Sequence, residues 1–206
     1  MEIKNIKYEN SEIFYAKVEI SLNELENIAF ESLSENDKNT YGNFKSEQRK
    51  KEWLAIRYII NKILRGHKIW QIKYSDDGRP FFDYLKVSIS HSADYVAVML
   101  SNHEVGVDIQ QISDKTLKIT RKFLSDTESN YFDVNNSTVT TLLWSIKETV
   151  YKLNNKRGVD FARDILIEPF DHQKSNFCCV KVNDNITIEV NYQLIENYWL
   201  SYSRLS

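Results

Sequence analysis

Asp108 and Glu148 are the two residues of this chain whose types and surroundings most suggest a metal site. Asp108 lies in an otherwise apolar run, Val105–Ile109, where a carboxylate loses hydration unless a cation meets it. A lysine or arginine partner is the commoner cation, and a divalent ion shared with Glu148 is the alternative. Mg²⁺ takes oxygen ligands, and one or two carboxylates plus substrate phosphates form its usual protein site. Gln110 points to the same strand face as Asp108 and could add its carbonyl oxygen directly or through a water molecule.

Glu148 belongs to a segment, residues 138–154, whose periodicity predicts a helix with two different faces. At about 100° per residue, one arc is apolar and contains Val139, Leu142, Leu143, Ile146, Val150 and Leu153. The opposite arc gathers Trp144, Lys147, Glu148, Tyr151 and Lys152. A solvated face would be small or charged, without aromatic rings beside a carboxylate and two ammonium groups. Aromatic and charged side chains on one helix face indicate a site that holds a metal or an anion against a flat or apolar partner.

A second polar cluster comes earlier, where Ser88, Ser90 and Ser92 alternate with apolar or aromatic residues. An extended strand would place the three serines on one face and His91 on the other. If the strand ends near Ser90, His91 could turn toward a ligand phosphate. A histidine with a purely structural role is the more common alternative.

Several basic residues could meet a polyphosphate. Arg79 lies in a Gly-Arg-Pro turn that would aim its cation, and Arg49 and Lys51 lie near the start of a helix expected over residues 46–65. Charge runs of this kind are usually a solvated helix face. They would matter only if a polyphosphate is bound, because ammonium groups and guanidinium forks are its natural partners.

The elements that must position these residues indicate an α+β fold, since helices and strands do not follow strict βαβ alternation. Each half is expected to contain one long helix and a set of antiparallel strands. The helix is expected at 46–65 in the first half and at 138–154 in the second. Further helices are expected at 21–32, 116–124 and 126–132, the first with a Ser21–Glu24 capping box and the last capped by Ser125. Strands are expected within 3–20 and at 70–74, 80–83, 86–90, 94–101, 105–110, 177–182, 186–194 and 198–203. The two halves are expected at 1–102 and 103–206.

Composition excludes several classes of protein. With 206 residues, 42% of them hydrophobic and 13% aromatic, the chain can bury a core and is not disordered. A net charge of −2 does not favour nucleic acid or an anionic membrane as the main partner. The sequence has no apolar run of membrane-spanning length and no signal core at its N-terminus. A cytoplasmic protein is therefore expected, with Cys178 and Cys179 as free thiols.

Three motifs in order give the sequence a family resemblance. Ser90–Ser92, Gly106–Ile109 and Trp144–Lys152 occur in the order and at the spacing of the two-domain, Sfp-type 4'-phosphopantetheinyl transferases. Gly78–Pro80 stands where that family usually has Gly-Lys-Pro, and Phe123–Glu128 is similar to its Phe-Phe-Ser-x-x-Glu segment. The resemblance covers the chain from about residue 34 to its end.

The resemblance implies a fold of two pseudo-two-fold-related halves, with coenzyme A and Mg²⁺ in the cleft between them. Residues 1–102 would form the coenzyme A-binding side, and residues 103–206 would carry the metal and the catalytic helix. A serine hydroxyl of an apo acyl or peptidyl carrier protein would attack the β-phosphorus of coenzyme A. The carrier would gain 4'-phosphopantetheine, and adenosine 3',5'-bisphosphate would leave. The resemblance also implies a monomer.

The resemblance assigns the catalytic roles to the C-terminal motifs. Asp108 and Glu148 would hold Mg²⁺, and Glu148 would also deprotonate the serine hydroxyl, directly or through water. Lys152 would stabilise the pyrophosphate with help from Lys147. One departure concerns Gln110, which stands where the family usually has an acid, so the metal site would carry one negative charge fewer and bind its metal more weakly.

The remaining implied roles concern the nucleotide. Ser90 and His91 would bind the region of the 3'-phosphate, and Arg79 would flank the adenosine. Lys51 or Arg49 would add a phosphate contact. Glu128 would serve as an auxiliary base or lie beside the metal.

Three functions remain open at this point. The leading one is an active holo-[acyl-carrier-protein] synthase of this family. The alternative, motivated by Gln110, is a catalytically weakened coenzyme A-binding or carrier-protein-docking homologue. An unrelated magnesium-dependent phosphotransferase has less support because the sequence has no phosphate-cradling glycine-rich loop.

Overall fold

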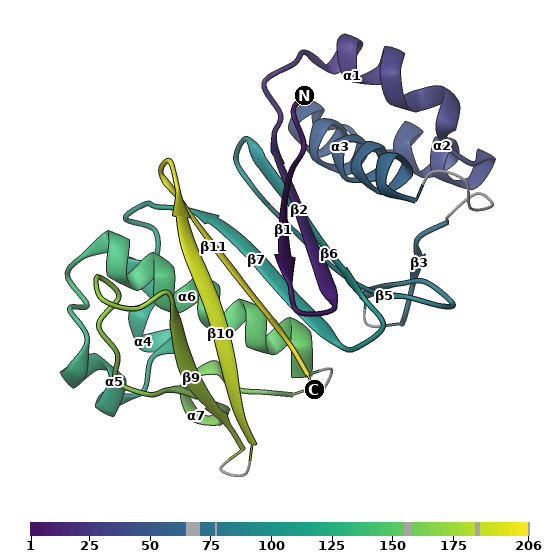
Figure 1. Ribbon diagram of the computed structural model, residues 1–206. Helices are drawn as coiled ribbons and strands as arrows, with labels where there is room; N and C mark the ends of the chain where they lie inside the picture. The colour runs from purple at the N-terminus through teal and green to yellow at the C-terminus, as the bar shows by residue number, and fades with distance from the viewer. Residues whose placement is uncertain (65–70, 77, 155–157, 184–185, 206) are drawn as a thin grey trace. The chain divides into compact units, whose positions relative to one another are not determined.

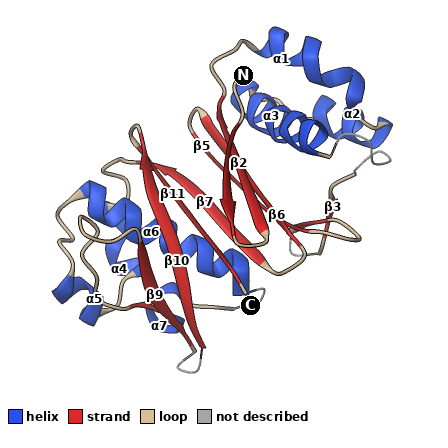
Figure 2. Cartoon of the chain, in the orientation of Figure 1, coloured by secondary structure: helices blue, strands red, loops and turns tan. Residues whose placement is uncertain are grey.

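The computed structural model describes residues 1–64, 71–76, 78–154, 158–183 and 186–205, and its chain divides into two compact units, Met1–Asn102 and His103–Ser206. Each unit combines helices with an antiparallel sheet (Figures 1 and 2). The expected α+β class is therefore confirmed. Within the described residues, every helix is too short or too polar to cross a bilayer.

The N-terminal unit contains a four-stranded antiparallel sheet in the order β1-β2-β6-β5. Its strands are β1 (Lys4–Tyr8), β2 (Ser11–Lys17), β5 (Lys86–Ser92) and β6 (Tyr95–Ser101). A separate short pair joins β3 (Lys73–Tyr74) to β4 (Pro80–Phe81). Strand β5 runs two residues beyond the expected strand end, which decides where His91 points.

The helices of this unit are α1 (Leu22–Ala29), the 3₁₀ turn η1 (Phe30–Ser32), α2 (Glu35–Gly42) and α3 (Glu47–Ile63). The expected capping box is present, because the Ser21 side chain accepts from the Glu24 backbone and Glu24 accepts from the Ser21 backbone. Helix α3 begins after Ser46, whose side chain caps it, and buries Trp53 and Ile59 in the core of the unit. Helix α2 was not expected. The expected stop at Gly66 lies outside the described residues.

The C-terminal unit contains a five-stranded antiparallel sheet in the order β7-β11-β10-β9-β8. Its strands are β7 (Val105–Gln111), β8 (Ile165–Ile167), β9 (Phe177–Val182), β10 (Ile186–Ile195) and β11 (Tyr198–Arg204). The helices are η2 (Leu117–Ile119), α4 (Thr120–Phe123), α5 (Asp126–Tyr131), α6 (Ser137–Asn154) and α7 (Phe161–Asp164). The two short elements β8 and α7 were not expected.

Helix α6 packs on the sheet of the C-terminal unit, chiefly against β7 and β11 (Figure 1). Its apolar arc matches the expected one, because Leu142, Leu143, Ile146, Val150 and Leu153 are all buried. A helix that packs on a sheet through such a stripe is fixed in rotation about its own axis. The rotation of α6 in turn decides which side chains face β7.

Gly106 allows β7 and α6 to come unusually close. A Cβ atom at this position would overlap the backbone carbonyl oxygen of Thr149. The Ser201 hydroxyl of β11 is also 2.7 Å from the hydroxyls of Ser145 and Thr149 on α6. The close approach and these buried hydrogen bonds fix the height of α6 above the strands, so Asp108 two residues after Gly106 meets the next turn of the helix.

Candidate active site

Asp108 is held by an ammonium group from helix α6. Its side chain is only 2% exposed, and the Lys152 Nζ atom donates to Asp108 Oδ1 at 2.8 Å and to the Val107 carbonyl oxygen at 3.0 Å. A buried carboxylate needs such a partner because its lost hydration is otherwise uncompensated. Lys152 therefore gives Asp108 a cationic partner from within the chain.

Glu148 lies one helical turn before Lys152 and faces the same buried carboxylate. Burial of Glu148 and the negative charge of Asp108 raise the pKa of the Glu148 carboxyl from 4.5 to about 7, and the positive charge of Lys152 offsets part of this increase. Glu148 and Lys152 lie one turn apart on α6 and Lys152 contacts Asp108, so the three side chains form one cluster. A carboxyl group that titrates near neutral pH suits general-base chemistry.

The same cluster fits a hard divalent cation. Asp108 and Glu148 offer two carboxylates that repel each other in the metal-free protein, and Gln110 lies two residues beyond Asp108 on β7, half-buried. Across the described residues, no group of three or more His, Cys, Asp or Glu side chains is arranged to hold a metal. The protein could thus supply two carboxylates and an amide oxygen, with substrate phosphates completing the coordination as in many Mg²⁺ sites.

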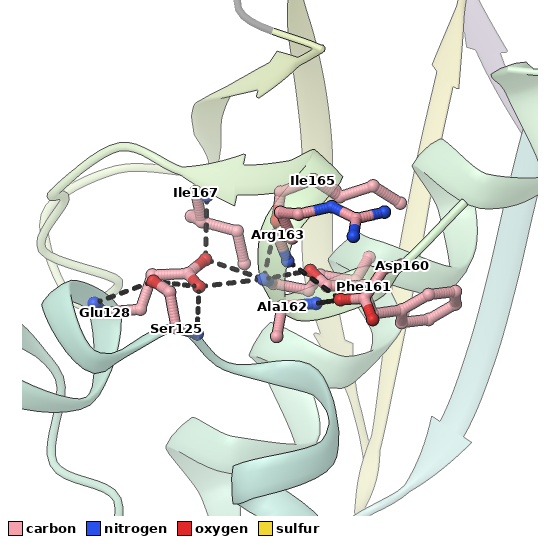
Figure 3. Close-up of polar contacts among 9 residues, drawn as sticks. Ser125, Glu128, Asp160, Phe161, Ala162, Arg163, Ile165 and Ile167 are labelled. Carbon is pink, nitrogen blue, oxygen red and sulfur yellow. Dashed lines mark hydrogen bonds and ion pairs between the residues drawn. The ribbon is translucent and has the colours of Figure 1, made fainter. Parts of the chain in front are cut away.

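Lys147 does not lie with Glu148, and the expectation that it assists at the pyrophosphate is not supported by its position. Its side chain is fully buried and donates to Glu128 at 2.8 Å, to the Phe161 carbonyl at 2.8 Å and to the Ile165 carbonyl at 2.6 Å (Figure 3). Burial lowers the pKa of Lys147 although Glu128 opposes the shift. The ammonium therefore ties α6 to α5, α7 and β8.

Glu128 is likewise a structural residue, which corrects the expectation of an auxiliary base. Its carboxylate accepts from the Ser125 backbone and hydroxyl, both at 2.8 Å, and from the Ile167 backbone at 2.8 Å (Figure 3). Ser125 and Glu128 form a capping box at the start of α5. Lys147 donates to the same carboxylate, so both oxygens of Glu128 accept hydrogen bonds within the protein. Glu128 therefore connects buried segments of the unit.

The aromatic residues expected beside Glu148 also face other parts of the unit. Trp144 packs against Phe123 with a centroid distance of 5.1 Å and against Phe161 at 5.5 Å, and Tyr151 packs against Phe161 at 5.2 Å. Helix α6 therefore has two neighbouring stripes in place of one mixed face. One stripe packs on α4 and α7, and the other carries Glu148 and Lys152 toward β7.

In the N-terminal unit, His91 lies on the opposite strand face from Ser90. Strand β5 stays extended through Ser92, so the possibility that it ends near Ser90 is wrong. Ser90 is buried, whereas His91 is exposed and lies with Nδ1 3.2 Å from Glu52 and Nε2 3.0 Å from Arg49 Nη1. Helix α3 therefore provides the polar partners of His91.

The cations predicted for the nucleotide have different surroundings. Arg49 is the basic residue of α3 that reaches His91, and Lys51 lies two residues further on, on another face of the helix. Arg79 follows Gly78, which has a φ of +80°, and its backbone exchanges hydrogen bonds with Ser75. These residues belong to the N-terminal unit, while Asp108, Glu148 and Lys152 belong to the C-terminal unit.

Comparison with known proteins gives this cluster a family context. Residues 104–203 match the sequence model of the 4'-phosphopantetheinyl transferase superfamily. That stretch contains Asp108, Gln110, Glu148 and Lys152. The C-terminal unit is thus similar to this superfamily over nearly its whole length. The resemblance drawn from the motifs is thereby confirmed at the level of the superfamily.

A curated relative points to the same superfamily. The chain is similar to the 4'-phosphopantetheinyl transferase gsp of Aneurinibacillus migulanus, with 33% identity over 110 residues. The match covers 51% of this chain and 46% of the relative. The chain therefore matches less than half of that transferase's length.

Proposed function

We propose that this protein transfers 4'-phosphopantetheine from coenzyme A to a serine hydroxyl of an apo acyl or peptidyl carrier protein. The observation that carries the proposal is the cluster of Asp108, Glu148 and Lys152 within the stretch that matches the transferase superfamily. Two carboxylates and an ammonium are what a reaction at a pyrophosphate requires, namely a base and groups that handle a highly charged substrate.

The reaction is a displacement at phosphorus. The serine oxygen forms a bond to the β-phosphorus of coenzyme A while the bond from that phosphorus to the pyrophosphate bridging oxygen breaks. Adenosine 3',5'-bisphosphate leaves with the bridging oxygen. The proton of the serine hydroxyl passes to the Glu148 carboxylate, directly or through a water molecule.

Glu148 is the proposed general base because its protonation state changes in the working range. A carboxyl with an ordinary pKa would be too weak to take a hydroxyl proton efficiently, and efficient catalysis places the pKa of the base near the operating pH. Burial beside Asp108 raises the pKa of Glu148 to about 7. The same burial shields the developing charge from water, which strengthens its interactions.

Asp108 and Lys152 are proposed to organise the charge around the pyrophosphate. Asp108 and Glu148 would hold Mg²⁺, with the Gln110 amide oxygen as a direct or water-mediated ligand. Bound there, Mg²⁺ would supply positive charge that offsets the charge of the pyrophosphate. Lys152 would donate hydrogen bonds to the pyrophosphate oxygens.

The N-terminal residues are proposed to bind the nucleotide portion of coenzyme A. His91 would bind the region of the 3'-phosphate, and Arg79 would flank the adenosine. Ser90 has less support as a partner at this phosphate, because its side chain is buried on the opposite strand face from His91. Lys51 remains a proposed phosphate contact. Arg49 has the stronger support of the two, because its guanidinium already lies 3.0 Å from the His91 ring.

A second candidate function follows from Gln110. A neutral amide in place of an acid leaves two carboxylates for the metal, so a coenzyme A-binding or carrier-docking protein with weakened catalysis is the alternative. Calorimetry separates the two, because the alternative predicts tight coenzyme A binding that does not depend on Mg²⁺ and is not followed by transfer.

The proposal also includes a monomer in the cytoplasm as its setting. Sedimentation at micromolar concentration tests the first point, and cell fractionation tests the second. Neither is required by the chemistry of the cluster.

The transfer itself is tested by intact-mass measurement of carrier proteins. Incubation with coenzyme A and Mg²⁺ should add one phosphopantetheine mass to at least one apo carrier among fatty-acid, polyketide and peptidyl carriers. Glu148→Gln should abolish the mass gain, and a carrier whose acceptor serine is changed to alanine is the matched control. Absence of the gain for every carrier would contradict the proposal.

A further inference from the structure

The ammonium of Lys152 contacts one carboxylate oxygen of Asp108, a residue proposed to hold the metal. Lys152 Nζ lies 2.8 Å from Asp108 Oδ1 and holds the Val107 carbonyl in addition. Both acceptors belong to β7, so the lysine side chain extends from the helix to the strand. The Lys152 side chain is 25% exposed and that of Asp108 only 2%, so the lysine is the more accessible partner.

The charges of the cluster explain why an ammonium occupies this position. Asp108 and ionised Glu148 contribute two negative charges, Gln110 contributes none, and Lys152 contributes one positive charge. Loss of Lys152 would remove this cation from a buried carboxylate, and breaking a buried ion pair costs several kcal/mol in general. Lys152 therefore compensates the buried carboxylate in the metal-free protein.

A divalent ion and an ammonium group are poor neighbours at this carboxylate. An ion held by Asp108 and Glu148 would lie a few ångströms from Lys152 Nζ, and like charges at that separation repel strongly in a partly buried setting. This repulsion favours movement of one of the two cations or weaker binding of one of them. The lysine can move, because its four-carbon chain is flexible and a quarter exposed.

We propose that Lys152 is an internal cation that competes with the divalent ion for Asp108, so that metal binding displaces its ammonium and presents it to the diphosphate of the substrate. This inference rests on the proposed function for the identity of the diphosphate, whereas the competition itself concerns only this chain and the metal. By linkage, a diphosphate that attracts the ammonium away from Asp108 strengthens metal binding, and metal strengthens diphosphate binding.

The opposite arrangement makes a different prediction. If Lys152 stays on Asp108 when metal binds, its ammonium orients the carboxylate for the ion, and loss of the lysine weakens metal binding. Competition predicts that loss of the lysine strengthens metal binding. The sign of a single affinity change therefore separates the two arrangements.

The test is the affinity of Lys152→Met for Mn²⁺, measured from the free-ion signal by electron paramagnetic resonance without coenzyme A or carrier. Competition predicts binding on the order of tenfold tighter than in the wild type. Lys181→Met is the matched control, because Lys181 forms an exposed ion pair with Glu168 at 2.9 Å and should bind Mn²⁺ as the wild type does. Equal or weaker binding by Lys152→Met would overturn the inference, as would absence of binding by all three proteins.

Thermal unfolding gives a second readout that does not depend on spectroscopy of the ion. In EDTA, Lys152→Met should unfold at a lower temperature than the wild type, and Mg²⁺ should raise its unfolding temperature more than that of the wild type, because ligand stabilisation follows affinity. If Lys152→Met does not fold, Lys152→Gln keeps a hydrogen-bond donor for Asp108 and should show the same gain in Mn²⁺ affinity.

The outcomes separate this inference from the proposed function. Tighter Mn²⁺ binding by the lysine variant together with no transfer by the wild type would support the competition and refute the transferase. Transfer by the wild type together with weaker Mn²⁺ binding by Lys152→Met would support the transferase and refute the competition.

Discussion

The Lys152 ammonium lies 2.8 Å from Asp108 Oδ1, and the two residues, on α6 and β7, are 44 positions apart in the chain. This contact places Lys152 and Glu148, one turn apart on α6, against the same buried carboxylate of β7. Gly106 makes the contact possible, because only a residue without a Cβ lets the strand approach the Thr149 carbonyl. The site thus depends on backbone packing as much as on its charged side chains.

The first prediction concerns the pH dependence of transfer. A general base must be ionised, and the pKa of Glu148 is raised to about 7 in the metal-free protein. At limiting Mg²⁺, kcat/KM should rise about tenfold per pH unit below this value and level off above it. Saturating Mg²⁺ should move the midpoint to lower pH, because a bound cation favours the ionised carboxylate. A profile that is flat between pH 5.5 and 8 would argue against Glu148 as the base.

The second prediction concerns stability against pH without metal. The pKa of Glu148 is about 7 in the folded protein and 4.5 by its ordinary value, so the folded state binds its proton more tightly than the unfolded state. The contribution of Glu148 to the free energy of unfolding should therefore fall as pH rises from about 4.5 to about 7 and stay low above that range.

Glu148→Gln tests this sign. In EDTA at pH 8, the variant should have a higher free energy of unfolding than the wild type, by on the order of 1–3 kcal/mol. At pH 4.5 the difference should largely vanish, because Glu148 is then protonated in the folded state. Urea unfolding at the two pH values measures both quantities, and a variant that is less stable at pH 8 would contradict the assignment.

The third prediction concerns Gly106. Gly106→Ala should lower the free energy of unfolding by about 2 kcal/mol or more, because its Cβ meets backbone atoms of Thr149 that can move only by shifting α6. The rate of transfer should fall by more than the loss of folded protein explains, because the same shift of α6 separates Asp108 from Glu148. Gly42→Ala is the matched control, because nothing lies within 4 Å of a Cβ at Gly42. Equal behaviour of the two variants in unfolding and activity would contradict this role.

The fourth prediction concerns the buried pair of Lys147 and Glu128. Lys147→Met should destabilise the protein by about 3–5 kcal/mol, because it leaves a carboxylate buried without its cation. Adding Glu128→Gln should recover part of that loss, so the two changes are not additive. If Lys147 bound pyrophosphate instead, the variant would raise the KM for coenzyme A several-fold with little loss of stability, which unfolding and steady-state kinetics would reveal together.

The fifth prediction concerns Gln110. Gln110→Glu should tighten Mg²⁺ binding about tenfold, since it adds a carboxylate beside Asp108 at the half-buried edge of the site. Calorimetric titration with Mg²⁺ measures the change. Gln111→Glu is the control, because the neighbouring residue points to the other face of β7. An unchanged affinity in Gln110→Glu would show that residue 110 does not contribute to the metal site.

Much of the fold follows from local sequence signals. The apolar arc of α6, the capping box at Ser21, the cap at Ser125, and the alternating strands β9 to β11 are all found where expected. Elements that local patterns specify poorly were missed. Helix α2 has only Tyr41 as a buried apolar residue, and β8 has three residues whose place depends on pairing with β9.

The site was predictable in its residues but not in its contacts. The sequence did not show which lysine would contact Asp108, because the contact depends on packing between β7 and α6. Helical periodicity grouped Lys147 with Glu148, although they lie on neighbouring stripes with different surroundings. The Ser125–Glu128 capping box was a usable signal, because a glutamate engaged as a cap is a poor candidate for a base. The contact of His91 with Arg49 is also non-local and could not be derived.

The decisive measurement for the transferase is the mass of an apo carrier protein after incubation with this protein, coenzyme A and Mg²⁺. We expect a gain of one phosphopantetheine on the acceptor serine, lost with Glu148→Gln and retained with the surface control Lys181→Met. No gain on fatty-acid, polyketide or peptidyl carriers, or an equal gain with Glu148→Gln, would contradict it.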